Sequence, residues 1–90
     1  MDRRKFMAGE WQAAEIASVL VQARPDRLAE VARAITAFAG TEIYSQDPRG
    51  KLVVVIEAPD VGAIGATLNK IALLPSVLSA TLVFHATDAA

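Results

Sequence analysis

Apolar positions along the chain repeat first with a period of two and then at spacings of three and four. Residues 16–23 (IASVLVQA) are apolar and β-branched, with polar residues on one alternating face, which predicts a strand. Pro25-Asp26 follows, and we expect it to begin a helix with a fixed φ and a capping carboxylate. Gly40 is placed to end that helix. The apolar stripe of the predicted helix consists of Leu28, Val31, Ala32, Ile35 and Phe38.

The second half of the chain repeats this order after a hairpin. Residues 41–46 return to a period of two, and residues 51–57 form a β-branched, apolar run. Between them, Asp47-Pro48-Arg49-Gly50 has the composition of a tight turn. Pro59-Asp60 then predicts a second helix start, and residues 77–85 predict a last strand. The stripe of this second helix is Val61, Ile64, Leu68 and Ile71.

The order βαββαβ predicts an α+β, ferredoxin-like fold, in which two helices cover one face of a four-stranded antiparallel sheet. We place the domain at residues 14–86, with a flexible basic tail at 1–13 and a short tail at 87–90. Alternation then assigns each strand residue to a face. We expect the helix side to carry Ala17, Val19, Val21, Leu52, Val54, Ile56, Leu78, Leu82 and Phe84. We expect the open side to carry Ser18, Leu20, Gln22, Tyr44, Val53, Val55, Glu57, Ser79, Thr81, Val83 and His85.

The composition favours a binding protein over an enzyme. Ninety residues make one domain with a two-layer core and no deep catalytic cavity. The chain is 53% hydrophobic but has no apolar run of about 18 residues, so we expect a globular protein without a transmembrane helix. It has no cysteine, which suits a reducing compartment, and its one histidine, His85, has no nucleophile or metal ligand near it in sequence. We therefore expect no catalytic residue, no metal and no cofactor.

Charge is distributed unevenly along the chain. The net charge is −1, but residues 1–9 carry three basic groups and one acid, which leaves six basic and nine acidic residues on 10–90. An acidic body disfavours nucleic acid and favours a basic partner. A guanidinium prefers bidentate contact with a carboxylate. The candidates for such a contact are Glu10, Glu15, Glu42 and Glu57.

The first residues resemble an export signal without completing one. Arg3-Arg4-Lys5-Phe6-Met7 has the arginine pair of a twin-arginine signal. Such a signal continues with about 7–15 apolar residues and a cleavage site of small residues. Here Glu10, Gln12 and Glu15 follow, and the next apolar stretch is the first predicted strand. We therefore expect that the chain is not itself exported.

The open sheet face is the predicted binding surface. It mixes aliphatic side chains with polar ones and is more apolar than a solvated face should be, and apolar patches of this kind often bind a partner. A strand edge offers a second mode, in which an extended peptide adds to the sheet. The residues that we expect to bind a peptide are Ser18, Leu20, Gln22, Val53, Val55, Glu57, Thr81, Val83 and His85.

Four segments in order resemble one family. They are residues 18–24 (SVLVQAR), 35–42 (ITAFAGTE), 50–58 (GKLVVVIEA) and 77–85 (VLSATLVFH), within a likeness that spans about residues 14–85. They resemble the NapD family, the cytoplasmic maturation chaperones of periplasmic nitrate reductase. The resemblance implies a cytoplasmic, non-catalytic protein that binds the twin-arginine signal peptide of the catalytic subunit NapA. Such binding restrains export of NapA until its molybdenum cofactor is inserted and its folding is complete.

Other interpretations stay open at this point. Residues 24–33 (RPDRLAEVAR), with Gly40 and a hairpin, also resemble the ligand-sensing ferredoxin-like domains of amino-acid-responsive regulators, which bind at the loop after the first strand. A third possibility is a structural module that dimerises through its open face. The arginine pair near the N-terminus departs from the NapD pattern. It is either an accidental basic tail or a mimic of the signal peptide, which would self-associate through Arg3, Arg4, Lys5 and Phe6.

Overall fold

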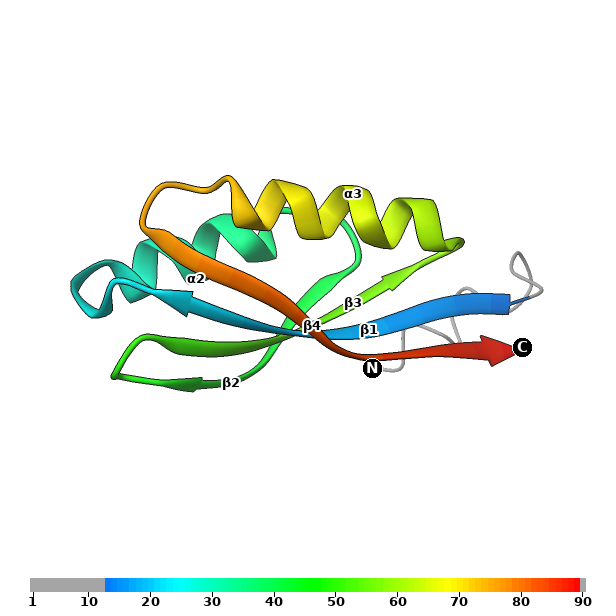
Figure 1. The fold of residues 1–90 in the computed structure, drawn as a ribbon, viewed down its shortest axis with the longest axis horizontal. Coiled ribbons are helices and arrows are strands. Elements are labelled where there is room, and N and C mark those ends of the chain that lie inside the picture. Colours follow the sequence, from blue (N-terminus) through cyan, green and yellow to red (C-terminus); the bar gives the residue numbers. More distant parts are fainter. Residues whose placement is uncertain (1–12, 90) are drawn as a thin grey trace.

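The computed structural model describes residues 13–89, which form one antiparallel sheet and two helices. The elements in order are β1 (Ala13–Ala23), the 3-10 helix η1 (Pro25–Arg27), α2 (Leu28–Thr36), β2 (Thr41–Asp47), β3 (Lys51–Ala58), α3 (Val61–Ala72) and β4 (Val77–Ala89). The strands are ordered β2-β3-β1-β4, and both helices lie on the same side of the sheet (Figure 1). The predicted ferredoxin-like α+β fold is therefore confirmed.

The first and last strands of the chain, β1 and β4, are longer than predicted. β1 begins at Ala13 and β4 runs to Ala89, whereas the sequence pattern predicted strands over residues 16–23 and 77–85. Paired backbone, which the apolar pattern alone did not reveal, extends these strands: Ala13 lies opposite Ala89, and Glu15 lies opposite Thr87. Of the expected tail at residues 1–13, residues 1–12, which include Glu10, lie outside the described residues. Neither helix of residues 13–89 combines the length and apolarity needed to cross a membrane.

The core lies between the sheet and the two helices. β1 and β3 alternate as predicted, because all of their residues that the sequence assigned to the helix side are fully buried. Apolar residues of α2 and α3, at the predicted spacings of three and four, pack on these strand residues and complete the core. The buried set is Ala17, Val19, Val21, Val31, Ile35, Leu52, Val54, Ile56, Ile64 and Ile71.

The two helices begin differently. The Asp60 carboxylate accepts a hydrogen bond from the Ala63 amide at 2.8 Å and caps α3 as predicted. At α2 the expected cap is wrong, because Pro25 begins a tight 3-10 turn in which the Arg27 amide donates to the Arg24 carbonyl. The helix starts only at Leu28, and the Asp26 carboxylate instead pairs with the Arg24 guanidinium at 3.3 Å.

The connection from α2 to β2 is fixed by two residues. Gly40 has the predicted left-handed backbone conformation (φ +79°), but it does not end the helix. α2 ends at Thr36 with Ala37 as a right-handed cap, and Gly40 instead forms the turn that leads into β2. The buried Thr41 hydroxyl lies 2.7 Å from the Ile35 carbonyl oxygen and 2.8 Å from that of Phe38, so it satisfies the end of α2. The Glu57 amide donates to the Gly40 carbonyl at 2.9 Å, which ties this corner to β3.

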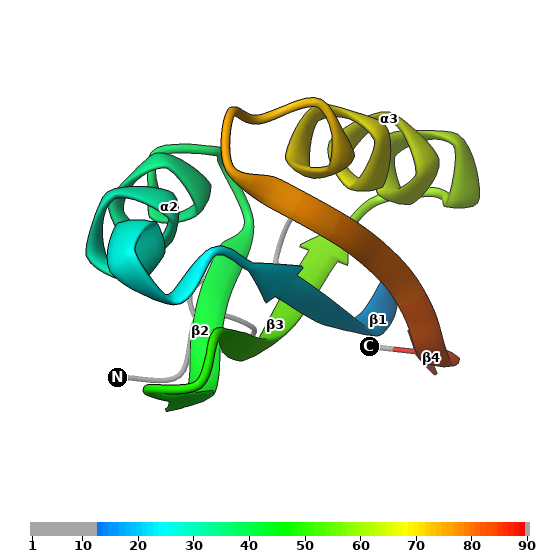
Figure 2. The same cartoon turned by 60° about the vertical axis from the view of Figure 1, so that its left-hand side comes forward.

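β4 is the edge strand beside β1 (Figure 2). Its register with β1 is interrupted twice. Val83 is an extra residue between the pairs Ser18–Phe84 and Val19–Leu82, and Leu78 is extra between the pairs at Ser79 and Val77. Successive strand residues point to opposite faces of the sheet, so each inserted residue reverses the face on which the following residues of β4 lie.

Several face predictions for β4 are therefore wrong. Phe84 lies on the open side, opposite Ser18, and not on the helix side. His85 lies opposite Ala17, on the helix side, and not on the open face. Leu78 is 68% exposed, and Val77 and Ala80 pack against the core instead. Leu82 lies on the predicted side, opposite Val19, but its side chain is exposed (44%).

Candidate functional site

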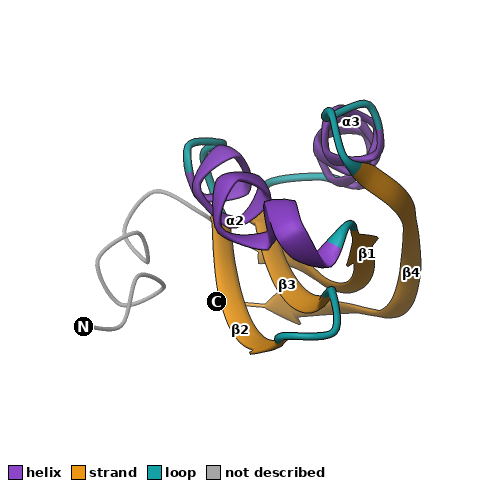
Figure 3. Cartoon of the chain, turned by 90° about the vertical axis from the view of Figure 1, so that its left-hand side faces the viewer, coloured by secondary structure: helices purple, strands orange, loops and turns teal. Residues whose placement is uncertain are grey.

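The face of the sheet opposite the helices is the candidate site. In the view down the sheet, α2 and α3 lie on one side and no helix or strand of residues 13–89 covers the other (Figure 3). We call this surface the open face. It presents side chains from all four strands on a rigid, hydrogen-bonded support.

Strand pairing arranges the open face in four rows across the sheet. From the end where β1 begins, the rows are Glu57, Ile16, Ala86; then Glu42, Val55, Ser18, Phe84; then Ser45, Val53, Leu20, Thr81; and last Asp47, Lys51, Gln22, Ser79. Tyr44 is the extra residue of an irregularity in β2 and is largely exposed. The rows place the charged residues at the two ends of β2 and β3 and the apolar residues between them.

The structure brings together most of the residues predicted to bind. Those on the open face are Ser18, Leu20, Gln22, Val53, Val55, Glu57 and Thr81. Val83 is the extra residue of the β4 bulge and is exposed, and His85 is on the opposite side. Sequence reasoning missed Ile16 and Phe84. Alternation backward from Ser18 would have found Ile16, whereas no sequence signal marked the bulge that turns Phe84 to this face.

The centre of the open face is apolar. Ile16, Leu20, Val53 and Val55 are half-buried by their neighbours in the sheet, and Phe84 is 58% exposed at the β4 edge. A large exposed aromatic side chain beside aliphatic ones is typical of a surface that is covered by a partner. The polar side chains of Ser18 and Thr81 lie among them and can accept or donate hydrogen bonds.

The two ends of the face differ in charge. Glu57 and Glu42 occupy the first and second rows, and Glu57 is half-buried. Asp47 and Lys51 are opposite each other in the last row. The Arg49 guanidinium lies 2.9 Å from the Asp47 carboxylate, and this hydrogen bond lowers the pKa of Asp47 to about 2.

Replacing Asp47 with Asn is expected to destabilise the hairpin modestly at neutral pH. The folded-state pKa of Asp47 is depressed from 3.8 to about 2, so its stabilisation is present above about pH 4 and is lost as the pH falls toward 2. Thermal melts of both proteins at pH 7 and pH 2 test this. The difference in Tm between them should shrink at pH 2, and a constant difference would contradict the assignment.

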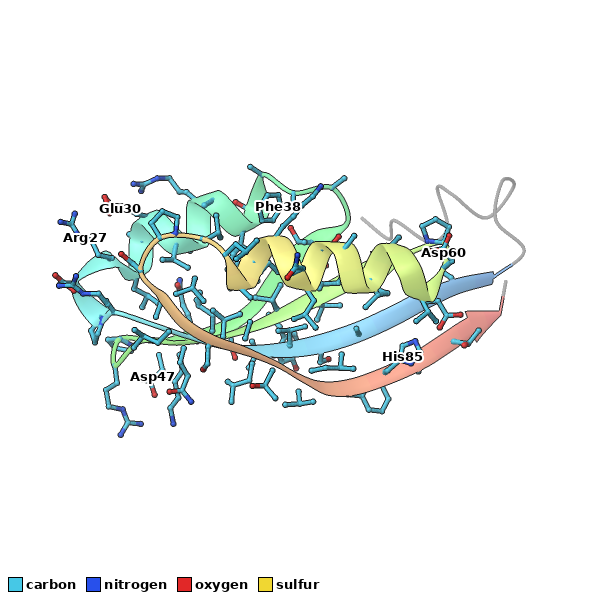
Figure 4. The ribbon with its side chains drawn as sticks, turned by 45° about the horizontal axis from the view of Figure 1, so that its top comes forward. Arg27, Glu30, Phe38, Asp47, Asp60 and His85 are labelled. Atoms are coloured by element: carbon cyan, nitrogen blue, oxygen red, sulfur yellow. The ribbon has the colours of Figure 1, made fainter. Side chains whose placement is uncertain are left out.

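His85 makes a structural contact on the helix side. Its Nε2 lies 2.6 Å from a Glu15 oxygen, and the Thr87 hydroxyl donates to the same carboxylate at 3.1 Å (Figure 4). Glu15, a predicted guanidinium partner, is thus held between β1 and β4, away from the open face. Among the described residues, no group of three side chains could hold a metal ion.

A surface pocket of about 610 Å³ lies on the helix side, after β1, where the ligand-sensing interpretation places its ligand. It is lined by Pro25, Leu28, Ala29, Ala32, Gln46 and Pro48. An amino acid carries a charged amine and a charged carboxylate, and this lining has no charged side chain to pair with either. The pocket therefore does not favour an amino-acid ligand.

Comparison with known proteins decides among the interpretations. Residues 14–89 match the family model described as NapD protein. The chain belongs to the NapD family. It is 34% identical to chaperone NapD of Escherichia coli (strain K12) over 80 residues, which are 88% of each chain. It is 40% identical to chaperone NapD of Paracoccus pantotrophus over 77 residues, 86% of this chain and 68% of the relative.

A solved structure agrees with these relatives. The solution structure of the E. coli Tat proofreading chaperone protein NapD matches with a TM-score of 0.76 and 32% identity, over 81% of this chain and 78% of that one. NapD proteins are chaperones, and a chaperone role involves no catalysis. The resemblance to the NapD family and the expectation of a non-enzymatic protein are both confirmed.

Proposed function

We propose that this protein is a cytoplasmic chaperone that binds the twin-arginine signal peptide of NapA, the catalytic subunit of periplasmic nitrate reductase. Binding delays export until the cofactor is inserted and NapA is folded. The proposal rests on membership of a family whose E. coli member is described as a Tat proofreading chaperone.

The observation that carries the proposal is the apolar open face. A twin-arginine signal has a basic pair followed by an apolar segment, and the open face offers Leu20, Val53 and Val55 between charged ends. As an amphipathic helix, the signal would cover this face as α2 and α3 cover the other. Four of the predicted binding residues, Ser18, Gln22, Glu57 and Thr81, lie on the same face around these apolar side chains.

Calorimetric titration with a peptide of the NapA twin-arginine signal tests the proposal. Tight binding is expected, and it should weaken when both arginines of the peptide are changed to Gln. Phe84→Ser should lower the affinity by about tenfold, because it removes a large exposed side chain from the open face. The matched control is Leu73→Ser, which removes an apolar side chain that is 75% exposed just after α3, on the helix side.

The outcomes separate the candidate faces. If Phe84→Ser weakens binding and Leu73→Ser does not, the open face binds the peptide. If the folded wild-type protein binds neither peptide, the proposal fails. If Leu73→Ser alone weakens binding, the site lies on the helix side.

We also propose that Arg3, Arg4, Lys5 and Phe6 compete with the signal peptide, because they repeat its order of basic and apolar residues. They would occupy the open face of their own chain or of a neighbouring one. Deleting residues 1–9 is then expected to raise the affinity for the signal peptide, because it removes a tethered competitor. Titrations of both proteins at fixed salt measure this, and an unchanged affinity would contradict self-association.

A further inference from the structure

We propose that Glu15 sets the register of residues 84–89 of β4 and thereby decides which of them the open face presents. Glu15 is a positioning residue, because it lies on the helix side and acts on the open face only through β4. The register follows from strand pairing and side-chain contacts alone. Its consequence for peptide binding rests on the proposed function.

Two registers are available to residues 84–89. In the structure Val83 is the extra residue of a bulge, and Phe84 lies opposite Ser18 on the open face. A strand without the bulge would instead pair Val83 with Ser18. Phe84 would then lie opposite Ala17, on the helix side, because a shift of one residue exchanges the faces. The two registers therefore place Phe84 on opposite sides of the sheet.

Apolar burial favours the regular register, which lacks the bulge. Phe84 is 58% exposed in the structure, whereas Ala17, its neighbour in the regular register, is fully buried on the helix side. Moving the aromatic ring to that side would remove part of its surface from water, which is favourable. The bulge also leaves one residue of β4 unpaired. The observed register therefore needs an interaction that outweighs both effects.

The Glu15 carboxylate provides this interaction. Its side chain is only 15% exposed, and His85 Nε2 lies 2.6 Å from one of its oxygens. The Thr87 hydroxyl donates to the same carboxylate, at 3.1 Å from each oxygen. Both partners follow the bulge, and the inserted residue is what places them on the helix side. The carboxylate thus fastens the end of β4 to β1.

The regular register would take both partners away from Glu15. Glu15 lies opposite Ala58 of β3, and a shift of one residue would place Ala86 opposite it on β4 in place of Thr87. An alanine side chain donates no hydrogen bond. A carboxylate held between two alanines would lose water without gaining a partner, which is costly. Glu15 therefore selects the register that keeps Phe84 on the open face.

NMR contacts between β1 and β4 measure the register directly. The wild-type protein should show Phe84 beside Ser18. Glu15→Leu removes the carboxylate and is expected to shift residues 84–89 to the regular register, with Phe84 beside Ala17. Glu15→Gln is the conservative control. Its amide both donates and accepts hydrogen bonds, so it should keep the wild-type register.

Deletion of Val83 separates the register from any other effect of Glu15. Without the extra residue, a regular strand pairs Phe84 with Ser18 and keeps it on the open face. The combination of Glu15→Leu with this deletion should therefore return Phe84 to the open face. A general loss of stability caused by Glu15→Leu would not be reversed in this way.

Calorimetric titration with the NapA signal peptide measures the consequence for binding. Glu15→Leu should lower the affinity by about tenfold, as expected for Phe84→Ser, because both changes remove the aromatic side chain from the open face. Glu15→Gln should bind within about twofold of the wild type. Deleting Val83 from the Glu15→Leu protein should restore the affinity.

The outcomes are distinct. If Glu15→Leu melts cooperatively and keeps Phe84 beside Ser18, Glu15 does not set the register and the proposal is wrong. If Glu15→Leu does not fold, His85→Ala combined with Thr87→Ala removes both partners from β4, and an unchanged register there overturns the proposal equally. A shifted register that the deletion reverses supports it. If the wild-type protein binds no signal peptide, the proposed function fails, and the NMR contacts alone decide the role of Glu15.

Discussion

Replacing Gly50 with Ala is expected to destabilise the protein by about 3 kcal/mol or more. Gly50 has φ +107°, a conformation that residues with a side chain rarely adopt. A Cβ at this position would lie 2.3 Å from the Ala23 carbonyl oxygen, which belongs to the backbone at the end of β1. The Ala23 amide also donates to the Gly50 carbonyl at 2.7 Å, so the two segments cannot separate without losing that bond.

Denaturant titration measures this effect, and Gly65→Ala is the matched control. Gly65 lies within α3, and a Cβ there would have no neighbour within 4 Å. The same substitution should therefore stabilise the protein by up to about 1 kcal/mol, since Ala is a better helix former. A Gly50→Ala protein as stable as the wild type would show that the hairpin moves away from β1 at no cost.

Replacing Ile35 with Ala is expected to cost about 2–5 kcal/mol of folding stability. Ile35 is fully buried between α2 and the sheet, so truncation leaves a cavity that its neighbours fill only in part. The free energy of unfolding from denaturant titration measures the loss. Because the cavity lies on the helix side, affinity for the signal peptide should stay unchanged under conditions where the variant is folded.

Leu73→Ala provides the comparison. Leu73 is 75% exposed at the end of α3, and its truncation should change stability by no more than about 0.5 kcal/mol. Similar losses in the two variants would mean that Leu73 is covered in solution, for example by a partner chain. A loss of less than about 1 kcal/mol in Ile35→Ala would contradict the core position assigned to Ile35.

Much of the fold could be predicted because the determining signals are local. Pro59-Asp60 predicted the start of α3, and strict alternation in β1 and β3 identified the helix side of both strands. Gly40 predicted a left-handed turn before β2, although α2 ends earlier, at Thr36. The Asp26 cap was wrong because Pro25 favours a tight turn as readily as a helix start. Whether Pro25 begins a tight turn or a helix depends on how η1 packs against the rest of the fold, and the order of apolar and polar residues does not reveal that packing.

The binding face was predicted on β1 and β3 but not on β4. The sequence of residues 77–85 is compatible both with a regular strand and with a strand that contains bulges, because a bulge requires no particular residue type. Pairing with β1 decides the register, and so it decides that Phe84 faces the open side and His85 faces Glu15. That Glu42 and Glu57 lie near each other on this face was likewise visible only once β2 and β3 were aligned.

The Val83 bulge has a consequence for solubility at high concentration. β4 is an edge strand of 13 residues, and its outer backbone groups could pair with the edge of another molecule. An approaching regular strand would fit the register on only one side of Val83, because the insertion breaks the row of available groups. The inserted residue that places Phe84 on the open face thus also opposes edge-to-edge aggregation of the sheet.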